Sequence, residues 1–135
     1  MEGPVGNCYK FVNDPQVPWN TAYGLCADMG GTLANFESWI EIYWMHGYRA
    51  SHSNIKTPPY WLGGYRTDHG WEWKGEITSS PIIITNWAFG EPNGASGDED
   101  CLMSHGWNPN DAYSYRWNDD KCRNKRPYIC ERNRV

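Results

Sequence analysis

The segments Trp87–Cys101, WAFGEPNGASGDEDC, and Trp117–Cys122, WNDDKC, carry most of the information on the fold and chemistry of this chain. Both are rich in carboxylate and carboxamide oxygens, and each ends at a cysteine. Pro92, inside Glu91-Pro92-Asn93, fixes the backbone between two of these donors. Calcium takes about six to eight oxygen ligands. The two segments therefore predict a calcium site, and the other residues are its scaffold.

Composition limits the class of protein. A chain of 135 residues suits one domain with one core, so we expect a single domain over residues 1–135. Nine Trp and nine Tyr fit a small, loop-rich domain, because these side chains bury large surfaces and keep a polar end. The net charge of -4 argues against a nucleic-acid partner, and we interpret the basic residues near the C-terminus as a solvated end segment.

The sequence has no apolar run long enough to span a membrane, which takes about 20 residues. Residues 1–7 lack both the basic and the apolar regions of a signal peptide. We expect the natural chain to extend upstream of Met1.

The five cysteines have no C-x-x-C spacing, which favours a disulfide framework over a zinc site and so an extracellular, secreted protein. Because five is odd, one of them lacks a partner within the chain, and the sequence does not fix the connectivity. A bridge between Cys101 and Cys122 would close the acidic loop, for about 3 kcal/mol in the chain-entropy treatment. A bridge between Cys26 and Cys130 would tie an early helix to the C-terminal strand, for about 4.7 kcal/mol.

Two amphipathic helices are predicted early in the chain. From Pro18 to Met29, apolar residues recur every three or four positions, which places Cys26 on the buried stripe of a helix that ends at Gly30-Gly31. A second helix is predicted from Glu37 to about Arg49, capped by Asn35 or Ser38. Its expected apolar face consists of Trp39, Ile40, Tyr43 and Trp44.

Two histidines, His46 and His52, lie near the end of the second predicted helix. We interpret them as surface residues that compensate the helix dipole rather than as ligands.

Short strands are predicted elsewhere, with a turn over residues 67–70 and a loop over Thr78–Pro81. The first strand is expected to break at Pro15 and Pro18. The predicted strands are Cys8–Val12, Thr32–Ala34, Tyr60–Gly64, Trp71–Trp73 and Tyr128–Glu131.

Taken in order, these features resemble a C-type lectin domain. The resemblance covers about Cys8 to Glu131, and the ordered set is specific although Glu-Pro-Asn alone would be weak. The motifs that carry it are Cys26, Gly30-Gly31-Thr32-Leu33-Ala34, Trp61-Leu62-Gly63, Asn86-Trp87, Glu91-Pro92-Asn93, Glu99-Asp100-Cys101, Trp117-Asn118-Asp119, Cys122 and Cys130.

The resemblance implies an α+β fold with two helices, two small antiparallel sheets and a long calcium-binding loop region. It implies disulfides between Cys26 and Cys130 and between Cys101 and Cys122, which leaves Cys8 unpaired or linked to a second chain in a homo-oligomer. It also implies that the Glu91–Pro92 peptide bond is cis.

In the family, side chains that match Glu91, Asn93, Glu99, Asn118 and Asp119 hold a calcium ion and the sugar. The backbone carbonyl matching Asp119 is also a ligand. A Glu-Pro-Asn motif implies calcium-dependent binding of mannose-type sugars on cell-surface glycans or glycoproteins, namely mannose, glucose, N-acetylglucosamine and fucose. We interpret Trp87 and Trp117 as core anchors rather than sugar platforms.

Three departures limit the resemblance. Gly94 stands where many members have an acidic ligand for a second calcium, so we expect one ion. The loop from Leu102 to Arg116 is longer than the usual connection and is a candidate wall of the sugar site or a subunit contact. Cys8 lacks the upstream cysteine that pairs with its counterpart in longer members.

Other functions remain open at the level of the sequence. Glu91 and Glu99 could be the acid and base of a glycosidase. Carboxylates crowded on a cation do not keep the raised pKa that a general acid needs, however, so we expect no enzyme. A protein-binding or ice-binding module on the same fold would keep the disulfides without an intact site. A galactose-binding lectin would differ only in selectivity.

Overall fold

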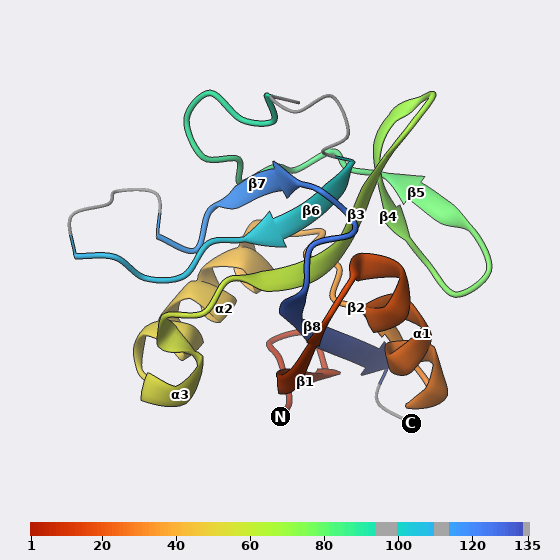
Figure 1. Cartoon of the computed structure of the whole chain (residues 1–135). Helices are drawn as coiled ribbons and strands as arrows, with labels where there is room; N and C mark the ends of the chain where they lie inside the picture. The colour runs from red at the N-terminus through yellow and green to blue at the C-terminus, as the bar shows by residue number, and fades with distance from the viewer. Residues whose placement is uncertain (94–99, 110–113, 134–135) are drawn as a thin grey trace.

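The structure is a computed structural model, and it describes residues 1–93, 100–109 and 114–133 (Figure 1). Its elements, in chain order, are β1 (Asn7–Val17), α1 (Trp19–Asp28), β2 (Thr32–Leu33), α2 (Trp39–Ala50), α3 (Ser53–Lys56), β3 (Tyr60–Thr67), β4 (Gly70–Lys74), β5 (Ser79–Pro81), β6 (Cys101–Ser104), β7 (Trp117–Asp120) and β8 (Arg126–Asn133).

The strands form one hydrogen-bonded sheet with two antiparallel parts. In one part β8 pairs with β1 and β2, and in the other β3 pairs with β4 and β6, β4 with β5, and β6 with β7. A parallel pair, Trp61 opposite Tyr128, joins the two parts. The two longer helices and the two antiparallel parts confirm the predicted α+β fold. The loop over residues 82–93 lies at the end of the molecule opposite to the termini (Figure 1).

Strand β3 is buried on both faces, which organises two core clusters. Tyr60 and Leu62 pack with Leu102 and Ile129 in the cluster beneath α2. Trp61, on the other face of β3, packs in the cluster that contains the disulfide cysteines. Because successive side chains of a strand point to opposite faces, one strand serves both clusters.

Helix α1 forms as predicted, with Trp19, Ala22 and Cys26 on its buried side. Gly30 ends it in the left-handed region at φ 85°. Gly31 allows β8 to approach, because a Cβ at this position would lie 2.1 Å from the carbonyl oxygen of Glu131. The disulfide between Cys26 and Cys130 then ties α1 to β8.

The predicted apolar face of α2 is wrong for three of its four residues, since only Trp44 packs against the core. Ser38 caps the helix as expected, since its Oγ accepts a hydrogen bond from the backbone N–H of Glu41. Trp39, Ile40 and Tyr43 are 46%, 65% and 63% exposed, and Trp44 is half-buried. The buried stripe consists of Glu41, Ile42, Met45 and Arg49. Two of these four residues are charged, so a hydrophobic pattern could not identify this stripe.

Arg49 is fully buried and joins several elements. Its guanidinium donates hydrogen bonds to the Ile55 carbonyl (3.1 Å), Ser104 Oγ (2.9 Å) and the Pro58 carbonyl (2.5 Å). It also lies over the rings of Tyr60 and Tyr115, at 4.9 and 4.6 Å. Burial lowers the pKa of Arg49 to about 10, so the group remains charged at neutral pH. One cation thus fixes α2 against α3 and β6.

Two strand predictions need correction. β1 continues past Pro15 to Val17, because a register shift between Val12 and Val17 accommodates the proline, and residues 13–16 are exposed. Ser79–Pro81, predicted as a loop, is the edge strand β5, paired with β4. All three of its residues are exposed, so it has no hydrophobic alternation to recognise. The four-residue helix α3 and the strands β6 and β7 were not predicted either.

We predict that Arg49→Met lowers the free energy of unfolding by about 2–4 kcal/mol, because two carbonyls and a hydroxyl lose their buried donor. Urea denaturation followed by tryptophan fluorescence measures this. Arg66→Met is the matched control, since Arg66 forms a surface ion pair with Asp100 and its side chain is 43% exposed. The control should cost less than about 1 kcal/mol. Equal losses in the two variants would contradict the assigned role of Arg49.

Candidate functional site

The loop before Glu91 is held against the start of β7 by backbone hydrogen bonds. The N–H of Trp117 donates to the carbonyl of Asn86 (2.8 Å), and the N–H of Ala88 donates to the carbonyl of Trp117 (2.8 Å). The N–H of Glu91 then donates to the carbonyl of Ala88 (3.0 Å). These bonds bring Glu91-Pro92-Asn93 beside Asn118 and Asp119, which follow Trp117 in β7.

Tryptophan side chains pack in or against the core beneath the contact between this loop and β7. The Trp117 ring lies 5.3 Å from that of Trp73 and 6.0 Å from that of Trp87, both edge to face. Trp87 also contacts Trp71 at 5.1 Å. Trp117 is 1% exposed and Trp87 packs against the core. Both side chains are therefore core anchors in this structure, as interpreted from the sequence.

The loop and β7 meet directly at Asn93. The Glu91–Pro92 peptide bond is cis, in agreement with the resemblance. The backbone N–H of Asn93 donates to Oδ1 of Asp119 (3.2 Å). Gly90, in the left-handed region at φ 80°, forms the turn before the motif. Two predicted ligand segments that lie about 25 residues apart in the sequence are thus adjacent in space.

Asn118 and Asp119 place buried oxygen atoms at this junction. Asp119 is 1% exposed. Oδ1 of Asn118 is buried and has no hydrogen-bond partner among the described residues. A buried carbonyl oxygen without a donor is costly, and a hard cation is one partner that would satisfy it. The donors present, carboxylates from Glu91 and Asp119 with carboxamides from Asn93 and Asn118, fit calcium.

The fifth predicted ligand, Glu99, lies outside the described residues, as do Gly94 and Asp98. Among residues 1–93, 100–109 and 114–133, no three His, Cys, Asp or Glu side chains converge on one point. Two of the five predicted ligands are carboxamides, so the described part of the site contains only the carboxylates of Glu91 and Asp119.

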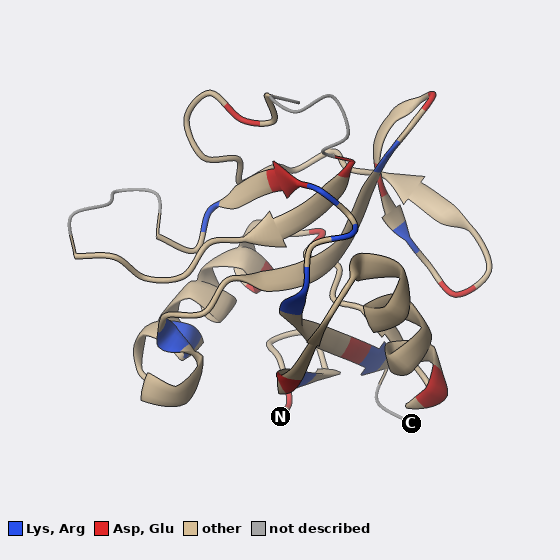
Figure 2. Cartoon of the chain, viewed as in Figure 1, with Lys and Arg blue, Asp and Glu red and all other residues tan. Residues whose placement is uncertain are grey.

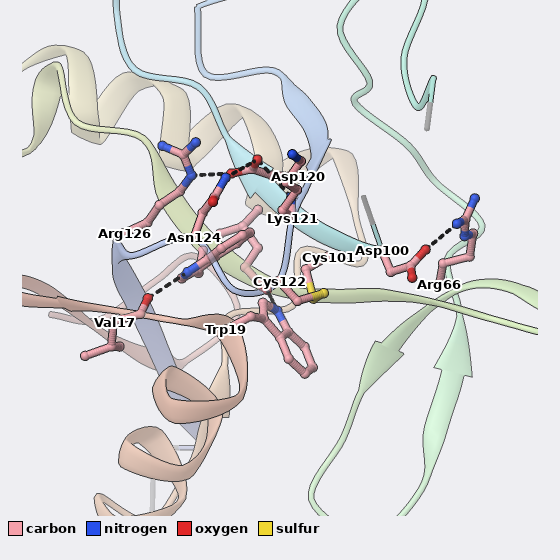
Figure 3. The surroundings of a disulfide bond; sticks show 12 residues. Val17, Trp19, Arg66, Asp100, Cys101, Asp120, Lys121, Cys122, Asn124 and Arg126 are labelled. Carbon is pink, nitrogen blue, oxygen red and sulfur yellow. Dashed lines mark hydrogen bonds and ion pairs between the residues drawn. A yellow bond between two sulfur atoms is a disulfide. The ribbon is translucent and has the colours of Figure 1, made fainter. Parts of the chain in front are cut away.

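The disulfide between Cys101 and Cys122 ties β6 to the segment after β7 (Figure 3). Asp120, the neighbour of Asp119, is directed into this region, where it accepts hydrogen bonds from Asn124 Nδ2 (3.0 Å) and from the guanidinium of Arg126. Asp100 pairs with Arg66 on the other side of the disulfide. The carboxylates of Asp120 and Asp100 therefore each pair with an arginine.

Acidic residues lie on both segments of the candidate site. Figure 2 shows acidic positions on β7 and on the loop beside it, and basic positions directly before and after β7. The acidic positions agree with a site for a cation.

The surface interpretation of His46 is wrong. Its Nε2 lies 2.9 Å from Nδ2 of Asn86, and Asn86 is only 5% exposed. Burial lowers the pKa of His46 to about 4, as do the charges of Arg49 and Arg116, while a hydrogen bond with the Tyr115 backbone opposes them. The imidazole is thus neutral at pH 7. The pattern of α2 alone did not indicate this position, because the partners of His46, Asn86 and Tyr115, lie in other parts of the chain. His52, in contrast, is exposed.

The segment Leu102–Arg116 is partly strand, because β6 extends to Ser104. Trp107 anchors the following loop to α3. The backbone N–H of Trp107 donates to the backbone carbonyl of Lys56 (2.9 Å), and the Lys56 ammonium lies 4.1 Å from the Trp107 ring centre. Residues 110–113, which include Asp111 and Tyr113, lie outside the described residues. The described start of this loop packs toward α3.

A family model of the lectin C-type domain matches residues 15–132. The chain belongs to the C-type lectin domain family. Ladderlectin from Oncorhynchus mykiss is 32% identical over 121 residues, which are 89% of this chain and 59% of that protein. A perlucin-like protein from Mytilus galloprovincialis is 33% identical over 136 residues, which are 92% of this chain and 75% of that protein. The chain thus spans only part of each relative.

Solved structures agree with the family. The C-type lectin domain of murine dendritic cell inhibitory receptor 2, in complex with N-glycan, has a TM-score of 0.77 and 26% identity, over 96% of this chain and 93% of that chain. A calcium-independent type II antifreeze protein has a TM-score of 0.75 over 100% of this chain and 91% of that chain. Its 20% identity shows a shared fold alone.

Domains of this family and fold are binding modules and not enzymes. No helix among the described residues has the length and apolar character that a membrane span requires.

Proposed function

We propose that this domain binds mannose-type carbohydrate through a calcium ion held by Glu91, Asn93, Glu99, Asn118 and Asp119. The observation that carries the proposal is the meeting of the cis Glu91-Pro92-Asn93 loop with β7, next to the buried Oδ1 of Asn118. Four of the five proposed ligands belong to these two segments, and Glu99 precedes β6 by two residues.

Bound calcium would supply coordination positions for the two hydroxyls of a vicinal diol. The chain's own residues would complete the recognition. Carboxylate oxygens of Glu91 and Glu99 would accept hydrogen bonds from the hydroxyls, and the amide N–H groups of Asn93 and Asn118 would donate hydrogen bonds to the hydroxyl oxygens. Because carboxylates only accept and the amide nitrogens only donate, the order of these residues around the diol selects which sugars bind.

Selectivity follows from the cost of a mismatch. A diol whose donors and acceptors face the wrong groups leaves a polar group unpaired, at about 1–3 kcal/mol. In the family, Glu-Pro-Asn accompanies the equatorial 3- and 4-hydroxyls of mannose and its relatives, and Gln-Pro-Asp accompanies galactose. The sequence Glu91-Pro92-Asn93 therefore supports the mannose class.

The relatives support the ligand class and the setting. One similar domain was solved with an N-glycan and another, at 27% identity, as an N-acetylglucosamine complex. Two disulfides agree with an oxidising environment, so we place the domain outside the cell with glycans or glycoproteins as partners.

We predict that the protein binds immobilised mannose only with calcium, at an affinity for the ion of about 0.1–1 mM. Excess chelator should release the protein, and acidification should do the same because protons compete with calcium for its carboxylate ligands. Calorimetry with calcium and elution from mannose-agarose measure both.

Retention on mannose-agarose in excess chelator at neutral pH would contradict calcium-mediated binding. No response to calcium and no glycan bound in an array would instead favour a protein-binding or ice-binding module on this fold.

We predict that Glu91→Gln with Asn93→Asp weakens mannose binding about tenfold or more and shifts preference toward galactose, since it exchanges the acceptor and the donor while keeping the net charge. Competition by free mannose and free galactose measures the shift. Glu76→Gln with Asn54→Asp is the matched control, because it makes the same exchange at exposed positions away from the loop. A wild type eluted by galactose but not by mannose would refute the assignment.

Cys8 is the only cysteine outside the two disulfides and is half-buried in β1. We predict that any disulfide-linked dimer of the protein is bridged at Cys8, so Cys8→Ser removes the dimer band on a non-reducing gel without changing the melting temperature or mannose binding. A dimer band that persists in this variant, or a variant that fails to fold, would show that the pairing is wrong.

A further inference from the structure

The side chain of His46, on the inner side of α2, contacts the two chain segments that lead to the proposed ligands, and we call these segments the arms of the site. His46 accepts a hydrogen bond from Nδ2 of Asn86 at 2.9 Å. It also has a hydrogen bond with the backbone of Tyr115, and the two rings lie 5.6 Å apart. Asn86 begins the segment that leads to Glu91, and Tyr115 begins the segment that leads to Asn118 and Asp119.

The arm through Asn86 is short and made of backbone hydrogen bonds. The backbone carbonyl of Asn86 accepts a hydrogen bond from the backbone N–H of Trp117, and the backbone carbonyl of Ala88 accepts one from the backbone N–H of Glu91. Asn86 is buried, so its amide needs a partner inside the protein. Loss of the His46 acceptor would leave that amide donor buried and unsatisfied, only five residues before Glu91.

The arm through Tyr115 contains a backbone conformation that needs support. Tyr115 has φ 65°, the only positive φ outside glycine among the described residues. A bulky residue keeps such a conformation only where its surroundings hold it. Ser104 Oγ donates to the Tyr115 carbonyl (2.8 Å), and the Arg49 guanidinium lies over the ring. His46 completes this set of contacts, three residues before Asn118.

We propose that His46 is a positioning residue, whose neutral imidazole links the loop of Glu91 and Asn93 to the strand of Asn118 and Asp119 and so presets the distance between the two halves of the ligand site. This inference rests on the proposed function for its meaning, but the link exists in the protein without calcium. Its chemistry requires Nε2 to be an acceptor, because Nδ2 of Asn86 only donates.

The surroundings of His46 keep it in the required state. Arg49 on α2 and Arg116 before β7 are the charged groups that act on it, and Tyr43 and Tyr115 contribute the neighbouring rings. The positive charges of both arginines disfavour protonation of the His46 imidazole. Protonation would convert Nε2 into a donor that faces the amide donor of Asn86, which would break the link.

The test compares three variants with wild type. His46→Phe keeps a ring and removes both hydrogen bonds, and it should weaken calcium affinity about tenfold. His46→Gln restores an acceptor near the position of Nε2 and should stay within about threefold of wild type. His52→Phe is the matched control, because His52 is exposed and contacts neither arm, and it should change nothing. Calorimetry well below the melting temperature measures the affinity of folded protein.

A double-mutant cycle separates positioning from general destabilisation. If His46 acts through Asn86, combining His46→Phe with Asn86→Ala should weaken calcium affinity no more than the worse single variant. Fully multiplied effects would overturn the link. Equal calcium affinities for His46→Phe and wild type would overturn it as well.

A second measurement works in EDTA and does not depend on the proposed function. Hydrogen exchange of the segments 84–93 and 114–120 should be faster in His46→Phe than in wild type and in His52→Phe. After correction for intrinsic rates, wild type should lose more protection than His46→Gln as the pH falls toward 4, because the glutamine cannot take up a proton and both proteins share the carboxylates of Glu91 and Asp119. If wild type ignores calcium but these exchange differences appear, the proposed function fails and the link stands; if they are absent, the link fails.

Discussion

The structure depends on the way Trp117 is enclosed. Both backbone groups of this residue bond to the segment 86–88, and its ring fills the space between Trp73 and Trp87. β7 is therefore fixed between β6 on one side and an irregular loop on the other. Asn118 and Asp119 follow Trp117 in β7, so its placement also fixes theirs. They therefore lie at a defined distance from Glu91 and Asn93, although these two residues belong to an irregular loop.

The candidate site could be proposed from the sequence because its residues belong to short contiguous motifs. Glu91-Pro92-Asn93 and Trp117-Asn118-Asp119 are contiguous, and the helical spacing around Cys26 correctly put that cysteine on a buried face. The connectivity of the disulfides came from the family resemblance, since the residues alone left several pairings open. The position of β5 was missed because three exposed residues carry no periodic pattern, and its pairing is set by β4 alone.

The inner face of α2 could not be read from its own sequence. Glu41 is buried because the hydroxyls of Tyr9 and Ser38 donate to it, and Arg49 because Ile55, Pro58 and Ser104 accept from it. Four of these five partners lie in other elements or loops. A charged residue is buried only when such partners exist, and nothing within the helix shows them. The same reason hid His46, whose partners are 40 and 69 residues away in the chain.

The position of the site also bears on how binding to one sugar becomes useful. A site of the proposed kind, which contacts a single diol, makes few interactions, so its affinity would have to be raised by presenting several sites together. The loop of Glu91 lies at the end of the molecule opposite to β1 and β8 (Figure 1). In a dimer bridged at Cys8, which is on β1, the two sites would remain uncovered and face away from the junction. Linkage would then add effective concentration without a new contact at either site, and the gain would depend on whether the spacing of sugars on the target matches the spacing of the two sites.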